Sequence, residues 1–163
     1  MDLAEIPADV LPRFAKDPAF TVMENPGFWG YRLRFNMEKL PEFKKEELRQ
    51  AFAYAINRQD LVDKIARGAA IPGSMGILSP HRRWYNPHLS PYDHNPEKAM
   101  GILAGLATGP RMSYELLVGG DREVRIGEIL KEQLDRVGIK LRVVSVNMKA
   151  RDARMGKSKM YRL

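Results

Sequence analysis

Apolar positions repeat with a helical period in the segment that begins at residue 45. They recur three or four residues apart, so they share one face of a helix, and this face must be buried. Asn57 follows as the N-cap of a second helix, which is predicted over residues 58–67 and ended by Gly68. Two consecutive helices are therefore predicted here. The apolar stripe of the first helix consists of Leu48, Ala51, Phe52, Ala55 and Ile56.

The last third of the chain has the pattern of a strand, a helix and a second strand. Residues 112–118 and 139–146 are predicted strands, and residues 121–137 carry the most regular helical stripe of the sequence. Gly138 is the predicted stop of this helix. A crossover helix between two strands implies parallel pairing within an α/β sheet.

The other segments are shorter or irregular. A short helix is predicted over residues 7–16, and strands over residues 20–24 and 29–36, where apolar and basic positions alternate in the second strand. Residues 69–94 form a long irregular loop, and Asn95 caps a helix that extends to about residue 106. The predicted fold class is α/β, a mixed sheet with flanking helices.

Composition narrows the possible functions. The chain of 163 residues contains no cysteine, which excludes disulfide scaffolds and cysteine nucleophiles. It shows no apolar stretch long enough to span a membrane and no secretion signal at its start. The net charge of +7 comes from residues 140–163, which hold eight basic residues and one acid, whereas the other 139 residues hold 19 of each sign.

Candidate chemistry is sparse, and no catalytic arrangement stands out, so an enzyme is not expected. His81, His88 and His94 lie six or seven residues apart in the irregular loop. Metal ligands usually have tighter spacing, so these are interpreted as solvent-facing histidines, with a metal site as the alternative. No metal or other cofactor is expected.

Two further groups are candidates for ligand contacts. The Gly119-Gly120-Asp121 turn between a strand and a helix can hold an anion on its backbone N–H groups, or it is a plain turn capped by Asp121. The aromatic residues Phe28, Trp29 and Tyr31 either line an apolar pocket or pack in the core.

The basic residues of segment 149–162 also have several interpretations. They form a solvated face or a frayed end, a cleft wall that attracts anionic ligands, or a contact with nucleic-acid phosphates. Tyr161 is the one aromatic residue among them, which makes the nucleic-acid interpretation the weaker one.

Several motifs, in their order along the chain, resemble the family 5 extracellular solute-binding proteins of ABC importers. The most specific is residues 47–58 (ELRQAFAYAINR), similar to the Arg-Gln-Ala helix and the Tyr-Ala-Ile-Asp-Arg that follows it in the family. A strand ending in Phe35-Asn36, a turn at residues 68–72, and residues 92–99 (YDHNPEKA) also match. The chain departs from the family ahead of residue 47, where the usual Pro-Pro-Phe and aspartate are missing, and in residues 150–163.

The resemblance implies one lobe of a type II periplasmic-binding-protein-like fold, in a receptor that captures a peptide-like or other small polar solute. Such receptors have two lobes and are much longer, so residues 1–147 correspond to most of a second lobe and residues 148–163 to a truncated or frayed basic segment. The implied partners are the ligand, the missing first lobe and an ABC permease. The implied location is periplasmic or extracellular, at the membrane.

The expected ligand contacts lie at the strand ends and in the aromatic group. A small basic nucleic-acid-binding or adaptor domain remains the alternative function. The candidate ligand-binding residues are Phe28, Trp29, Tyr31, Gly120, Asp121, Arg122, Asn147 and Met148.

Overall fold

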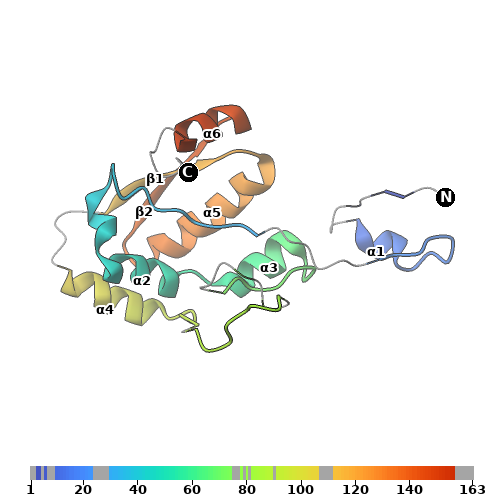
Figure 1. The fold of residues 1–163 in the computed structure, drawn as a ribbon, viewed down its shortest axis with the longest axis horizontal. Coiled ribbons are helices and arrows are strands. Elements are labelled where there is room, and N and C mark those ends of the chain that lie inside the picture. Colours follow the sequence, from blue (N-terminus) through green and yellow to red (C-terminus); the bar gives the residue numbers. More distant parts are fainter. Residues whose placement is uncertain are drawn as a thin grey trace. The chain divides into compact units, whose positions relative to one another are not determined.

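The helical repeat that begins at residue 45 forms α2 (Glu46–Ala55), whose buried face is Leu48, Ala51, Phe52 and Ala55. Ile56, the last residue of the predicted stripe, is the half-buried C-cap after the helix. The predicted second helix is α3 (Arg58–Ala66). The structure is a computed structural model, and Figure 1 shows the order of its elements along the chain. The structure describes residues 3–4, 6, 10–23, 30–74, 78, 80, 82–89, 91–106 and 112–156.

The chain divides into two units. The first consists of residues 1–32 and 58–91, and it contains α1 (Leu11–Phe14) and α3. The second consists of residues 33–57 and 92–163, and it contains the other elements. These are the 3₁₀-helix η1 (Pro41–Lys44), α2, α4 (Pro96–Gly105), β1 (Ser113–Val118), α5 (Asp121–Asp135), β2 (Lys140–Ser145) and α6 (Met148–Gly156).

The strand–helix–strand prediction is confirmed. β1 and β2 pair in parallel, from Ser113 opposite Lys140 to Val118 opposite Ser145, and α5 connects them. Gly138 adopts a φ of 88° after α5 ends, a left-handed conformation that glycine accepts without steric cost. This turn sends the chain directly into β2.

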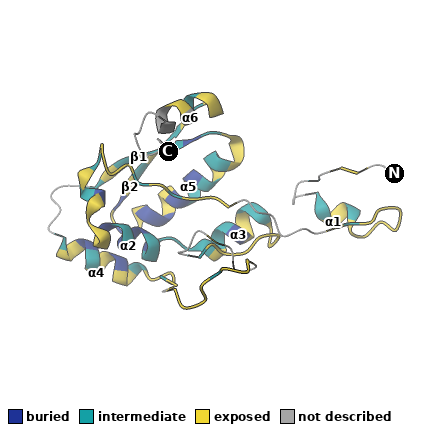
Figure 2. Ribbon diagram, viewed as in Figure 1, coloured by how far each residue is buried: buried dark blue, intermediate teal, exposed yellow. Residues whose placement is uncertain are grey.

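One face of the two-stranded sheet carries the core. Side chains two residues apart on a strand point to the same face, so Tyr114 and Leu116 share it. The Tyr114 ring packs 4.7 Å from the ring of Phe43 in η1, and Leu116 packs under α5 near Gly127. Figure 2 shows the buried positions of α2, α4 and α5 that complete this core. Its buried residues are Phe43, Leu48, Ala51, Phe52, Ala55, Ala99, Leu103, Leu134, Val137 and Ile139.

The start of α4 also matches the prediction. The Asn95 side chain accepts a hydrogen bond of 2.9 Å from the Lys98 N–H, and Pro96 occupies the first turn. The Asn95 N–H donates to the Tyr54 carbonyl at 2.8 Å, which fixes the cap beside the end of α2. The cap therefore serves both the helix and its packing.

The two predicted N-terminal strands are wrong in their described parts, residues 20–23 and 30–36, which form no strand. Leu33 and Phe35 pack against the core while Arg32 and Arg34 are exposed, so the alternation reflects one-sided packing without a backbone ladder. The described part of the sheet consists of two parallel strands. The predicted helix over residues 7–16 is reduced to α1 in its described part, 10–16, and no helix or strand occurs in the described residues of the 69–94 loop.

Candidate functional site

The carboxyl ends of β1 and β2 lie side by side, because Val118 is opposite Ser145 in the register. The Val146 N–H donates to the Val118 carbonyl at 3.0 Å and extends the pairing by one more bond. Both strands then lead into helices, α5 and α6, whose N-termini start at this edge. In open α/β sheets, ligands bind in the crevice outside the carboxyl ends of the strands. The carboxyl edge is therefore the candidate site.

At the start of α5, Gly120 is the N-cap in extended conformation, with φ −161° and ψ 168°. Its carbonyl accepts from the Val124 N–H at 2.9 Å. The alternative that Asp121 caps the helix is wrong, because Asp121 is already the first helical residue and caps nothing. Asp121 and Arg122 are both exposed, so each presents a charge to solvent at the edge.

At the start of α6, Asn147 acts as a cap. Its side-chain oxygen accepts from the Ala150 N–H at 2.8 Å, and its carbonyl accepts from the Arg151 N–H at 2.9 Å. The sequence did not predict this helix within the basic segment. Met148 follows the cap with 57% of its surface exposed, an apolar side chain beside polar groups. The structure thus brings five of the eight predicted contact residues, 120–122 and 147–148, to one edge.

An ion pair that was not predicted lies between these two helix starts. The Glu123 carboxylate accepts from Arg151 Nη1 at 2.6 and 2.8 Å, and from the Gly119 N–H at 2.5 Å. The Glu123 and Arg151 side chains are 26% and 19% exposed. At the Gly119-Gly120-Asp121 turn, where an anion position was predicted, the Gly119 N–H therefore binds the chain's own Glu123 carboxylate.

The sequence contained a signal for Glu123 but not for Arg151. Glu123 stands three residues after the N-cap Gly120, the position from which a glutamate reaches back to backbone N–H groups in a capping box. Arg151 was one of many basic residues in a segment that had no predicted element. Only the parallel register, which aligns the ends of β1 and β2, brings the two side chains together.

The aromatic candidates belong to the first unit. Tyr31 is 59% exposed and lies in no helix or strand, so it does not pack in the core. Phe28 and Trp29 lie outside the described residues.

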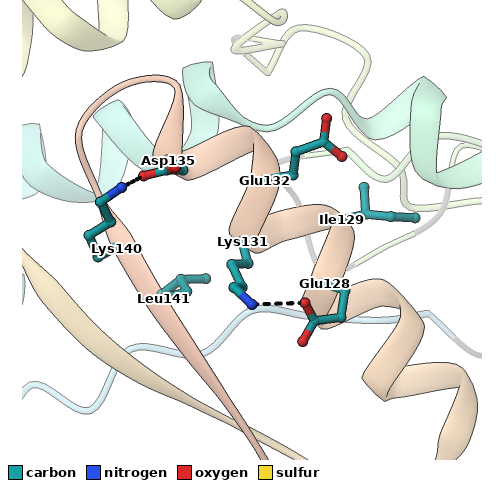
Figure 3. Close-up of a pocket in the computed structure, with 7 residues that line it drawn as sticks. All are labelled: Glu128, Ile129, Lys131, Glu132, Asp135, Lys140 and Leu141. Atoms are coloured by element: carbon teal, nitrogen blue, oxygen red, sulfur yellow. Dashed lines mark hydrogen bonds and ion pairs between the residues drawn. The ribbon is translucent and has the colours of Figure 1, made fainter.

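Two shallow depressions in the second unit lie away from the carboxyl edge. Two ion pairs line the first depression: Lys131 binds Glu128 at 3.0 Å, and Lys140 binds Asp135 (Figure 3). It lies beside the first residues of β2, whereas the candidate site lies beyond the last ones. The second depression lies between α2 and α4. Neither collects the predicted contact residues, so neither is taken as the site. The first is lined by Glu128, Ile129, Lys131, Glu132, Asp135, Lys140 and Leu141.

The described residues do not form a metal-binding site. His88 and His94 are exposed, and His81 lies outside the described residues. Within the described ranges, histidines and carboxylates do not gather in groups of three or more that could hold a metal ion. In the same ranges, no helix has the length and apolar character needed to cross a bilayer.

Comparison with known proteins gives the family. The profile described as "Bacterial extracellular solute-binding proteins, family 5 Middle" matches residues 1–162. The dipeptide-binding protein of Escherichia coli K12 is 28% identical over 85% of this chain and 26% of its own length.

Two solved structures share the fold. The ABC transporter-associated periplasmic binding protein DppA of Helicobacter pylori, in complex with the peptide STSA, has a TM-score of 0.77 at 21% identity. The match covers 91% of this chain and 29% of that one. NikZ of Campylobacter jejuni, in complex with Ni(L-His), has a TM-score of 0.73 at 20% identity, over 88% and 31%. The predicted α/β fold class, of the periplasmic-binding-protein type, is confirmed.

The family match changes the balance between the two predicted functions. It gives no support to a nucleic-acid-binding or adaptor domain, and the family is made up of solute-binding proteins. This chain spans about a quarter of the length of the curated relatives it matches. The profile match nevertheless spans residues 1–162, and the chain belongs to the family 5 bacterial extracellular solute-binding proteins.

Proposed function

We propose that this chain is the ligand-binding part of a substrate-binding protein of an ABC importer, which captures a peptide-like or other small polar solute. The observation that carries the proposal is the carboxyl edge, where the starts of α5 and α6 gather exposed polar groups in a member of this family. It acts by binding and has no catalytic role.

The chemistry of the edge suits a small solute with both charge signs. Asp121 offers a carboxylate, Arg122 a guanidinium, and Asn147 a carboxamide, and all three residues are exposed. Met148 adds apolar surface beside them. A dipeptide carries an ammonium group, a carboxylate and apolar side chains, so each of its parts has a counterpart here. Phe28, Trp29 and Tyr31, which belong to the first unit, are also proposed as ligand contacts.

The proposed receptor closes around its ligand with a first lobe that this chain does not contain. Its further partner is an ABC permease, and its place is the periplasm or the outer side of the membrane. The DNA on either side of the coding segment provides a direct check of these partners. We expect it to encode the first lobe and permease subunits; unrelated genes on both sides would contradict the importer assignment.

Nuclear magnetic resonance tests the binding edge itself. The ¹⁵N-labelled chain is titrated with alanyl-phenylalanine to about 10 mM, because one part of a cleft binds weakly, with Kd of about 1 mM or more. We expect shift changes at the amides of Gly120, Asp121, Arg122 and Met148. The same peptide with acetyl and amide ends lacks both charges and is expected to produce smaller changes.

The outcome that contradicts the proposed edge is equally specific. Shift changes confined to Glu128, Ile129 and Leu141 would place binding in the depression of Figure 3 instead. No change anywhere up to about 10 mM would reject peptide binding by this chain. Micromolar affinity in calorimetry would contradict the requirement for a second lobe.

A further inference from the structure

The two loops of the carboxyl edge are tied to each other by side chains that are not themselves candidate ligand contacts. Glu123 bonds to the Gly119 N–H on its own loop and to Arg151 on the neighbouring helix. We propose that Glu123 and Arg151 are positioning residues that hold the two ligand-facing loops in one fixed arrangement. We refer to Gly119, Glu123 and Arg151 as the clamp. Its role in ligand binding rests on the proposed function.

Helix α6 needs such a tie because burial of its described side chains does not hold it. Among its described side chains none is buried: Met148, Lys149 and Ala153 are exposed, and Ala150 and Arg151 are intermediate. Its length of nine residues makes an isolated helix marginal in water. The bond from Arg151 to Glu123 connects it to α5, a helix of fifteen residues that packs on the sheet.

The space around Gly119 supports the same inference. A Cβ built on Gly119 would lie 2.9 Å from Arg151 Nη1 and 3.2 Å from its Cδ, so the guanidinium passes directly over this residue. A glycine at this position lets the Arg151 side chain cross the loop and reach Glu123. Gly120, the next residue, has nothing within 4 Å of a Cβ built in the same way. The two glycines therefore make a matched pair for a test.

The first variant, Gly119→Ala, displaces the end of a flexible arginine side chain and leaves the charges in place. We expect hydrogen exchange of the Ala150 and Arg151 amides to accelerate about tenfold, because α6 loses its tie to α5. Gly120→Ala is the control: it alters the cap of α5, but we expect the same two α6 amides to exchange as in the wild type. The amides of Leu116 and Val143 in the sheet report whether the fold is intact, and they are expected to be unchanged in both variants.

The second variant, Arg151→Met, keeps the aliphatic stem and removes the guanidinium. We expect the Gly119 and Ala150 amides to exchange about tenfold faster, whereas Lys149→Met, which removes an exposed charge from the same helix, leaves them unchanged. Unchanged exchange at Ala150 in both Gly119→Ala and Arg151→Met would overturn the clamp. Acceleration that extends equally to Leu116 and Val143 would reduce it to a general stabilising contact and would also overturn the proposal.

The alanyl-phenylalanine titration separates this inference from the proposed function. With the clamp and the binding edge both correct, Arg151→Met weakens the peptide affinity about fivefold, which is the scale of one ion pair. If the wild-type chain binds no peptide, the proposed function fails, while the exchange measurements still decide on the clamp. If the wild type and Arg151→Met bind with equal affinity, the clamp has no positioning role.

Discussion

At the scale of single residues, Gly127 determines how closely α5 approaches the sheet. A Cβ at this position would lie 3.0 Å and 3.2 Å from the two methyl groups of Val143, and 3.4 Å from a methyl of Leu116. Val143 is β-branched and held in the sheet, so it cannot rotate away freely. The absence of a side chain at Gly127 is therefore a packing requirement and not a feature of the ligand site.

Gly127→Ala should accordingly push α5 away from β1 and β2. We expect a loss of about 1–3 kcal/mol in the free energy of unfolding, from overpacking. Gly101→Ala, inside α4, is the matched control: nothing lies within 4 Å of its Cβ, and alanine favours the helix by about 0.5–1 kcal/mol. Urea unfolding followed by circular dichroism measures both. A stable Gly127→Ala variant would show that the helix shifts at little cost.

Tyr114 makes the folding stability depend on pH in the alkaline range. Burial, and secondly the charge of Glu42, raise the pKa of the Tyr114 phenol above its ordinary value of 10.0. The unfolded chain then loses this proton at a lower pH than the folded chain, so stability falls as pH rises above about 10. Below that pH the effect is absent.

The corresponding variant is Tyr114→Phe, which keeps the ring and removes the titrating group. Urea midpoints measured from about pH 8 to about pH 11, on both sides of the ordinary phenol pKa, should fall less steeply in this variant than in the wild type. Parallel curves for the wild type and Tyr114→Phe would contradict the raised pKa.

At the scale of elements, Gln133 connects α5 to the end of α2. This side chain is 6% exposed, and its oxygen accepts from the Asn57 N–H at 3.0 Å while its nitrogen donates to the Asn57 carbonyl at 3.4 Å. Both backbone groups of one residue are thus bound by one amide. A polar residue inside the apolar stripe of α5 is explained by this backbone contact.

Gln133→Leu preserves the approximate size and removes both bonds. We expect a loss of about 1–3 kcal/mol in the free energy of unfolding, because the Asn57 N–H loses a buried acceptor. Gln59→Leu, at an exposed position on α3, should change stability by less than about 0.5 kcal/mol. The two variants are compared by urea unfolding, and equal stability would show that Gln133 is not an anchor.

The elements that the sequence predicted correctly are those with a complete local signal. α4 has its Asn95 cap, and α5 has a regular stripe and Gly138 as its stop. The segment 30–36 was misassigned because alternation records which side of the chain packs, not whether the backbone finds a partner strand. α6 was missed because none of its described side chains is buried, so this part of the sequence shows no apolar period.

The candidate site, too, was predictable only where the sequence carries a local signal. Gly120 and Asn147 were recognisable as strand ends, and the parallel register then placed them at one edge. The pairing of Glu123 with Arg151 joins positions 28 residues apart and depends on that register, so no local pattern contains it. Contacts between distant segments follow from the fold and not from any single motif.

At the scale of the whole molecule, the described buried residues are distributed unequally between the units. All but one of the described buried apolar side chains belong to the second unit, and the exception is Val62 on α3. Since buried apolar surface supplies most of the folding free energy, the second unit should be the more stable one.

Amide hydrogen exchange tests this difference directly. We expect the helical amides of α3 to exchange at least about tenfold faster than those of α5, through local opening of the first unit. Val62→Ala should accelerate amide exchange in α3 without changing it in α5, whereas Leu134→Ala, at a fully buried position, should accelerate exchange in α5 by destabilising the core by about 2–5 kcal/mol. Equal protection of α3 and α5 in the wild type would show a single cooperative unit.

The path of the chain through the two units has a consequence for how the sequence can change. Residues 58–91 leave the second unit after Asn57 and return before Tyr92, and Arg58 Nη2 donates to the Pro91 carbonyl at 2.5 Å. The segment is thus a closed excursion whose two ends are already joined. Closing a shorter or longer loop between joined ends changes the chain entropy little. Evolution can therefore lengthen, shorten or exchange this excursion while the core around Leu134 keeps its sequence.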